Sequence, residues 1–120
     1  MYLNNPLFKP HTMAKLNYDE LLCFILLYTA KADYKINREE QEFILRKIDK
    51  KTYDRLNERM EDMSDYDILQ EILSYEKEHF PNTEGKEKLI QDIRMLFHVD
   101  GEFDLLEENM LIYIRKLIRA

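Results

Sequence analysis

Hydrophobic residues recur at helical spacing through most of the chain, and polar residues suited to capping helices precede several of these runs. Asn17 and Glu20 have the spacing of a capping box and predict a helix from there to about Ala32. The apolar residues between Leu21 and Ala30 go almost all the way round this helix. Such a distribution is typical of a helix buried at the centre of a domain.

Five further helices are indicated by the same two signals, a cap and an apolar stripe at spacings of three and four. In chain order their markers are Asn37 with Glu40, Tyr53 to Met63, Ser64 with Asp67, Leu89 to Phe97 after Pro81, and Asp104 with Glu107. About six helices joined by short loops predict an all-α bundle. Residues 1–16 have two prolines and no clear period, so we expect a loosely ordered arm before a helical domain spanning residues 17–120.

One segment of the first half resembles a segment near the end of the chain. Laying Ala32–Leu45 over Val99–Ile112 aligns Asp33 with Asp100, and the offset, 100 − 33, is 67 residues. Each copy consists of a hydrophobic helix, a short acidic turn and a capped helix. Because only two copies exist, the pattern predicts a duplicated motif rather than a solenoid. The two hydrophobic helices, first and fifth, would then meet at the centre of the bundle about an approximate two-fold axis.

The two copies of the motif, "ADYKINREE" and "VDGEFDLLEE", resemble the repeated motif of the tellurite-resistance TerB-like family. The resemblance covers about Tyr18 to Ile118. It implies an internally duplicated all-α fold with two central helices, a role in stress responses to tellurite and other toxic agents, and acidic positions suspected of binding metal. The family pattern prefers glycine where this chain has Tyr34, so we expect the first turn to differ in shape from the second.

The polar positions of the two acidic turns have more than one interpretation. A site for a divalent cation (Ca²⁺, Mg²⁺ or Zn²⁺) would use Asp33, Asn37, Glu40, Asp100, Asp104 and Glu107. As helix caps, Asn37 and Asp104 would each contribute about 1 kcal/mol, and a glutamate three residues later would complete each capping box. A third interpretation is an acidic face that docks a partner. An EF-hand is excluded, because glycine is second and glutamate eighth in the turn rather than sixth and twelfth.

Composition and charge exclude several classes of function. The formal net charge of −6 and the pI of about 5.1 disfavour binding to nucleic acid. The single cysteine, Cys23, is expected to be a small buried hydrophobe in a reducing compartment, and the longest apolar run is too short to span a bilayer. We therefore expect a cytoplasmic protein without a transmembrane segment. The chain has no glycine-rich phosphate loop, Cys-x-x-Cys pair or HExxH motif, so an enzyme is disfavoured.

These observations favour a non-enzymatic TerB-like stress-response module that works with protein partners, with a membrane-associated complex as one setting. Its activity would come through the acidic turns, by cation binding or by docking. The alternative is a protein-interaction or scaffold domain in which the acidic turns are only helix caps. The sequence does not set the oligomeric state. The eight tyrosines and six methionines are expected to lie mostly on inward stripes.

Overall fold

The computed structural model describes residues 15–33, 36–99 and 105–120, and these form seven α-helices and no strand. In chain order the helices are α1 (Tyr18–Asp33), α2 (Arg38–Leu45), α3 (Lys50–Glu61), α4 (Asp65–Leu73), α5 (Glu76–His79), α6 (Thr83–Phe97) and α7 (Leu105–Ile118). The prediction of an all-α bundle is confirmed. The additional helix is α5, a single turn that begins without a side-chain cap and that neither sequence signal marks.

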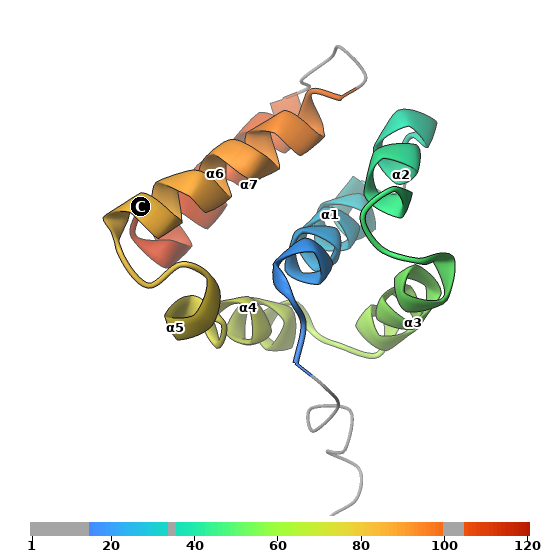
Figure 1. Ribbon diagram of the computed structural model, residues 1–120, viewed down its shortest axis with the longest axis horizontal. Helices are drawn as coiled ribbons and strands as arrows, with labels where there is room; N and C mark the ends of the chain where they lie inside the picture. The colour runs from blue at the N-terminus through green and yellow to red at the C-terminus, as the bar shows by residue number, and fades with distance from the viewer. Residues whose placement is uncertain (1–14, 34–35, 100–104) are drawn as a thin grey trace, which may run out of the picture.

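Figure 1 shows α1 near the middle of the molecule, with α6 and α7 on one flank, α2 and α3 on the other, and α4 and α5 below. The contacts agree, since α1 packs against α3, α4, α6 and α7. Side chains from Leu21 to Thr29 are all buried. The hydroxyl of Thr29 donates to the carbonyl of Ile25 at 3.1 Å, so its burial leaves no hydrogen bond unmade. The prediction of a central first helix is therefore confirmed by burial and by packing.

Side-chain caps fix where the helices begin. Asn17 Oδ1 accepts the backbone N–H of Glu20 at 2.8 Å, and Glu20 Oε1 accepts the N–H of Asn17 at 2.8 Å. This capping box before α1 is the one that the sequence predicts. Ser64 caps α4 as predicted, and Asp49 and Asn82, which were not singled out, cap α3 and α6.

Cys23 is fully buried in α1, as the sequence predicts. Burial, with a smaller contribution from Glu20, raises the pKa of the Cys23 thiol to about 12. The thiolate is the reactive form of cysteine, so this side chain acts as a packing group at neutral pH.

Burial and helix packing can be compared between the two halves of the predicted duplication. Glu40 and Glu107, at matching positions, are both buried. In the predicted duplication α1 corresponds to α6, and α2 corresponds to α7. A contact of α2 with α6 in one half then has its counterpart in a contact of α7 with α1, and both contacts are present. The halves are not equivalent, since α6 packs closely on α7 whereas α1 packs mainly on α3. The duplication and the pair of central helices remain predictions.

Most of the described tyrosines and methionines lie inward, and three are exposed. Tyr28, Tyr53, Tyr75, Met60 and Met63 are buried, whereas Tyr66, Met95 and Tyr113 face outward. Within the described ranges, no helix combines the length and the apolar character needed to cross a bilayer.

Candidate functional site

The six predicted site residues are divided between the described part of the chain and the rest. Asp100 and Asp104 lie outside the described residues, and Asp33 is described only as the last backbone position of α1. The structure places the side chains of Asn37, Glu40 and Glu107, the last of which is buried in the first turn of α7. Whether the two acidic turns converge is therefore not tested by the described residues.

Asn37 and Glu40 form the predicted capping box at the start of α2. Asn37 Oδ1 accepts the backbone N–H of Glu40 at 2.7 Å, and Glu40 Oε1 accepts the backbone N–H of Asn37 at 3.3 Å. Glu40 is only 4% exposed. The cap interpretation is therefore confirmed for these two residues, whose side chains already satisfy backbone donors at the helix start.

The cation hypothesis remains a prediction. Across residues 15–33, 36–99 and 105–120, no three His, Cys, Asp or Glu side chains converge in a way that would hold a metal ion. Three of the six proposed ligands are not placed by side chain, so the hypothesis has to be tested in solution.

If the acidic turns bind a cation, millimolar Ca²⁺, Mg²⁺ or Zn²⁺ should raise the Tm. Binding only to the folded state stabilises it by about 2.7 kcal/mol when the ion is at 100 times its Kd. Differential scanning fluorimetry with each ion measures this, and Asp100→Asn should remove the rise. Asp62→Asn, which removes the same charge from the exposed end of α3, is the matched control and should keep the rise. An unchanged Tm with all three ions would reject the hypothesis.

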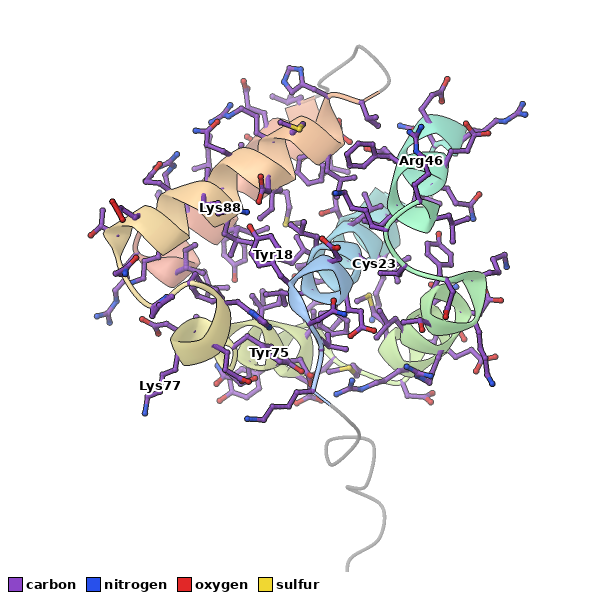
Figure 2. The ribbon with its side chains drawn as sticks, in the orientation of Figure 1. Tyr18, Cys23, Arg46, Tyr75, Lys77 and Lys88 are labelled. Atoms are coloured by element: carbon purple, nitrogen blue, oxygen red, sulfur yellow. The ribbon has the colours of Figure 1, made fainter. Side chains whose placement is uncertain are left out.

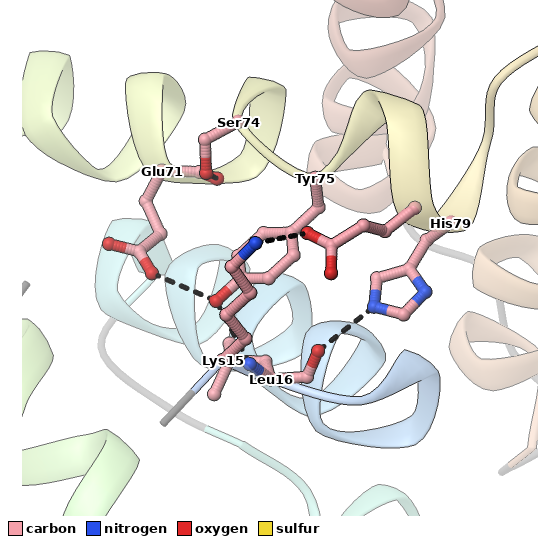
Figure 3. Close-up of polar contacts among 7 residues, drawn as sticks. Lys15, Leu16, Glu71, Ser74, Tyr75 and His79 are labelled. Atoms are coloured by element: carbon pink, nitrogen blue, oxygen red, sulfur yellow. Dashed lines mark hydrogen bonds and ion pairs between the residues drawn. The ribbon is translucent and has the colours of Figure 1, made fainter. Parts of the chain in front are cut away.

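A polar network joins α3, α4 and α5 to Leu16, the residue before the cap of α1. The sequence patterns did not predict it. Arg59 Nη2 and Glu71 Oε1 form an ion pair at 2.6 Å, and their side chains are only 8% and 11% exposed. The hydroxyl of Tyr75 donates to Glu71 Oε2 at 3.4 Å and accepts the backbone N–H of Leu16 at 3.0 Å. Figure 3 shows Glu71 on α4 and Tyr75, just before α5, reaching toward Leu16 at the start of α1.

His79 completes the attachment of Leu16. Its Nε2 lies 2.9 Å from the Leu16 carbonyl oxygen, and because a carbonyl oxygen only accepts, Nε2 carries the hydrogen. The Tyr75 and His79 rings stack with centroids 5.5 Å apart. Glu71, Tyr75 and His79 follow one another at intervals of four, a spacing that could have revealed a polar face in the sequence. No side chain of this network is a nucleophile hydrogen-bonded to a general base. Tyr75 and His79 instead hold the backbone N–H and carbonyl of Leu16.

A second polar cluster joins α1 to α6. The hydroxyl of Tyr18 donates to Asp92 Oδ2 at 2.6 Å, and Lys88 Nζ donates to the same oxygen at 2.6 Å while lying 4.3 Å from the centre of the Tyr18 ring. Figure 2 shows Tyr18 and Lys88 in the space between these helices. Burial, together with the Asp92 carboxylate, raises the pKa of Tyr18 above its ordinary value, so the phenol stays protonated at neutral pH. The cluster borders a cavity of about 190 Å³, and its polar groups already bind one another.

A second hollow is a groove between α1 and α3, which we call the α1–α3 groove. It has a volume of about 380 Å³ and is lined by Leu27, Ala30, Lys31, Ile36, Tyr53, Asn57, Met60 and Glu61. Ile36 lines it and is the first described residue after the first acidic turn. Lys31 Nζ donates to the carbonyls of Met63 at 2.8 Å and Met60 at 3.4 Å, which fastens α1 to the C-terminal end of α3.

Glu61, which lines the α1–α3 groove, belongs to an acid-rich stretch of the chain. The segment that ends α3 and begins α4 carries five exposed acids, which we call the acidic junction: Glu58, Glu61, Asp62, Asp65 and Asp67. None of the five forms an ion pair with another described residue. The one base within the segment, Arg59, is bound to Glu71. The groove therefore has a mainly apolar lining, with Lys31 and Glu61 among its residues and further exposed acids close to Glu61 in the sequence.

A scan against protein-family models, a search of curated proteins and a search of solved structures found no match to this chain. The resemblance to the TerB-like family rests on the two acidic motifs and on their spacing.

Proposed function

We propose that the chain is a non-enzymatic TerB-like helical module whose activity is protein binding. In this proposal the α1–α3 groove takes apolar side chains from a positively charged segment of a partner protein. The observation that carries the proposal is the mainly apolar groove whose lining includes Glu61 of the acidic junction. The groove and the acidic junction thus act as the docking surface, and Asn37 and Glu40 act as caps at the start of α2.

The size and lining of the groove fit this kind of ligand. Its volume of about 380 Å³ lies near the lower end of the range for pockets that enclose small molecules. Leu27, Tyr53 and Met60 supply apolar surface, so two or three apolar side chains on one face of a helix would fill it. Unpaired carboxylates of the acidic junction favour basic flanking residues and speed their encounter.

Rigidity supports the same conclusion. The groove lies between two helices that Lys31 joins through hydrogen bonds to backbone carbonyls. A preformed groove binds with less loss of conformational entropy than a flexible loop does. The TerB-like resemblance supports placing the module in a stress-response complex, where the partner would be another protein of that complex.

The proposal predicts selective binding of a basic amphipathic helix. The probe is a synthetic peptide of about five turns with leucines on one face and lysines on the other, and its control has glutamates in place of the lysines. Titration of the ¹⁵N-labelled protein should shift the amide signals around Leu27, Tyr53 and Met60 with the basic peptide. The acidic peptide should leave these signals unchanged. Equal responses to both peptides, or shifts confined to other helices, would contradict the proposal.

Two pairs of variants sharpen this test. Ala30→Trp fills the groove and should weaken binding of the basic peptide by at least about tenfold, whereas Gln91→Trp on the exposed side of α6 should not. Glu61→Lys should weaken binding about fivefold at low salt and less at high salt. Its control is Glu84→Lys, which makes the same charge change at the start of α6, on the opposite flank from α3 in Figure 1.

A further inference from the structure

Helix α7 exposes hydrophobic side chains on its solvent face. Its inner side buries Leu111, Ile114 and Ile118, as an amphipathic helix should. On its outer side Leu105 is 70% exposed and Ile112 is 49% exposed. These two residues are seven positions apart and therefore lie on one face. A helix face that contacts only water ordinarily carries polar residues at such positions.

Two charged residues share this face with Ile112 and are placed symmetrically about it. Glu108 lies four residues before Ile112 and Lys116 four residues after it, and both are exposed. We call Leu105, Glu108, Ile112 and Lys116 the outer face of α7. Neither Glu108 nor Lys116 forms an ion pair with any residue that the structure describes. Arg115, just outside this face, does pair within the chain, with Glu87 at 2.8 Å.

From this pattern we infer that the outer face of α7 binds the same face of a second copy of the chain, with the two helices antiparallel. A two-fold axis at Ile112 brings Ile112 of each copy together and sets Glu108 of one copy against Lys116 of the other, twice. Leu105 then lies beside the last turn of α7 in the second copy. A self-complementary face of this kind is what a two-fold dimer requires.

The charges select the antiparallel orientation. Parallel helices would set Glu108 against Glu108 and Lys116 against Lys116, and both contacts repel. The contact is small, because α7 has 14 residues and is about 21 Å long. The dimer therefore belongs to the weak class that buries less than about 1,200 Å² and dissociates in the micromolar range or above. The inference does not depend on the proposed function, since α7 and the α1–α3 groove occupy different flanks of the molecule (Figure 1).

A charge-swap experiment tests the dimer. Sedimentation velocity of the full chain from about 10 µM to about 1 mM should show self-association of the wild type. Glu108→Lys and Lys116→Glu should each raise the dimer Kd by at least about tenfold, and the double variant should restore it to within about threefold. The two residues are eight positions apart, about 12 Å along one helix, so restoration cannot come from a contact within one chain.

Mixing the two single variants gives a second readout. An antiparallel heterodimer of Glu108→Lys with Lys116→Glu regains both opposite-charge contacts, so the mixture should associate more tightly than either variant alone. Ile112→Cys should also form a covalent dimer under mild oxidation, while Gln91→Cys on α6 should not; the native Cys23 is buried and does not compete. A wild type that stays monomeric at every concentration, or a double variant no better than the single ones, would overturn the inference.

Discussion

Replacing Arg59 with methionine is expected to lower the free energy of unfolding by about 3 to 5 kcal/mol. The substitution keeps an unbranched side chain of similar helix propensity but removes the guanidinium and its charge. The Glu71 carboxylate, only 11% exposed, would then lose the guanidinium that lies 2.6 Å from it. Removing one member of a buried ion pair costs more than the pair contributes, because the other charge stays in a poorly solvated position. Chemical denaturation followed by circular dichroism measures the loss.

Two comparisons separate this effect from the general cost of substitution. Arg38→Met breaks the exposed Arg38–Glu42 pair on α2, whose side chains are 85% and 60% exposed, and should cost less than about 1 kcal/mol. Arg59→Met combined with Glu71→Leu removes both buried charges and should be more stable than Arg59→Met alone. A double variant at least as unstable as the single one would show that the charge is not what makes Arg59 important.

Replacing Phe24 with alanine is the second change expected to have a large effect, again about 3 to 5 kcal/mol. Phe24 is fully buried in α1, the helix that packs against four others. The substitution removes an aromatic ring and leaves a cavity that close-packed neighbours only partly fill. Since this loss is a large part of the stability of a small domain, Phe24→Leu provides a milder variant, with an expected loss of roughly 1 to 1.5 kcal/mol.

The matched control for Phe24 is Tyr66→Ala, which truncates an aromatic side chain that is 69% exposed on α4. Its effect should stay within about 0.5 kcal/mol. Urea denaturation of the three variants gives the comparison, with the slope of the transition checked for constancy. Equal losses for Phe24→Ala and Tyr66→Ala would mean that α1 is not the centre of the core.

The features predicted correctly from the sequence depend on residues close together in the chain. The capping boxes at Asn17 with Glu20 and at Asn37 with Glu40 need only a spacing of three, and both hydrogen-bonding patterns are present. The burial of α1 follows from apolar residues on every side of one helix. Such local signals decide the fold class because backbone geometry and capping act within a turn or two.

The features that were missed depend on how helices pack. Arg59 and Glu71 are twelve residues apart and meet only because α3 and α4 fold against each other. The α1–α3 groove likewise exists only between packed helices, so no periodicity in either helix reveals it. The single turn α5 has too few residues for a stripe. The cation hypothesis for the acidic turns stays a prediction, since Asp33, Asp100 and Asp104 have no described side chains.

The attachment of Leu16 by Tyr75 and His79 has a consequence for local dynamics. A backbone amide ahead of the first helix normally exchanges its hydrogen with water quickly, because no helical partner protects it. Here the Leu16 N–H is buried against the Tyr75 hydroxyl, and the carbonyl of the same residue is held by His79. Deuterium can enter at this amide only when the end of α4 and the turn α5 move away from it. A single slowly exchanging hydrogen near the beginning of the described chain thus reports how often a segment some sixty residues later opens.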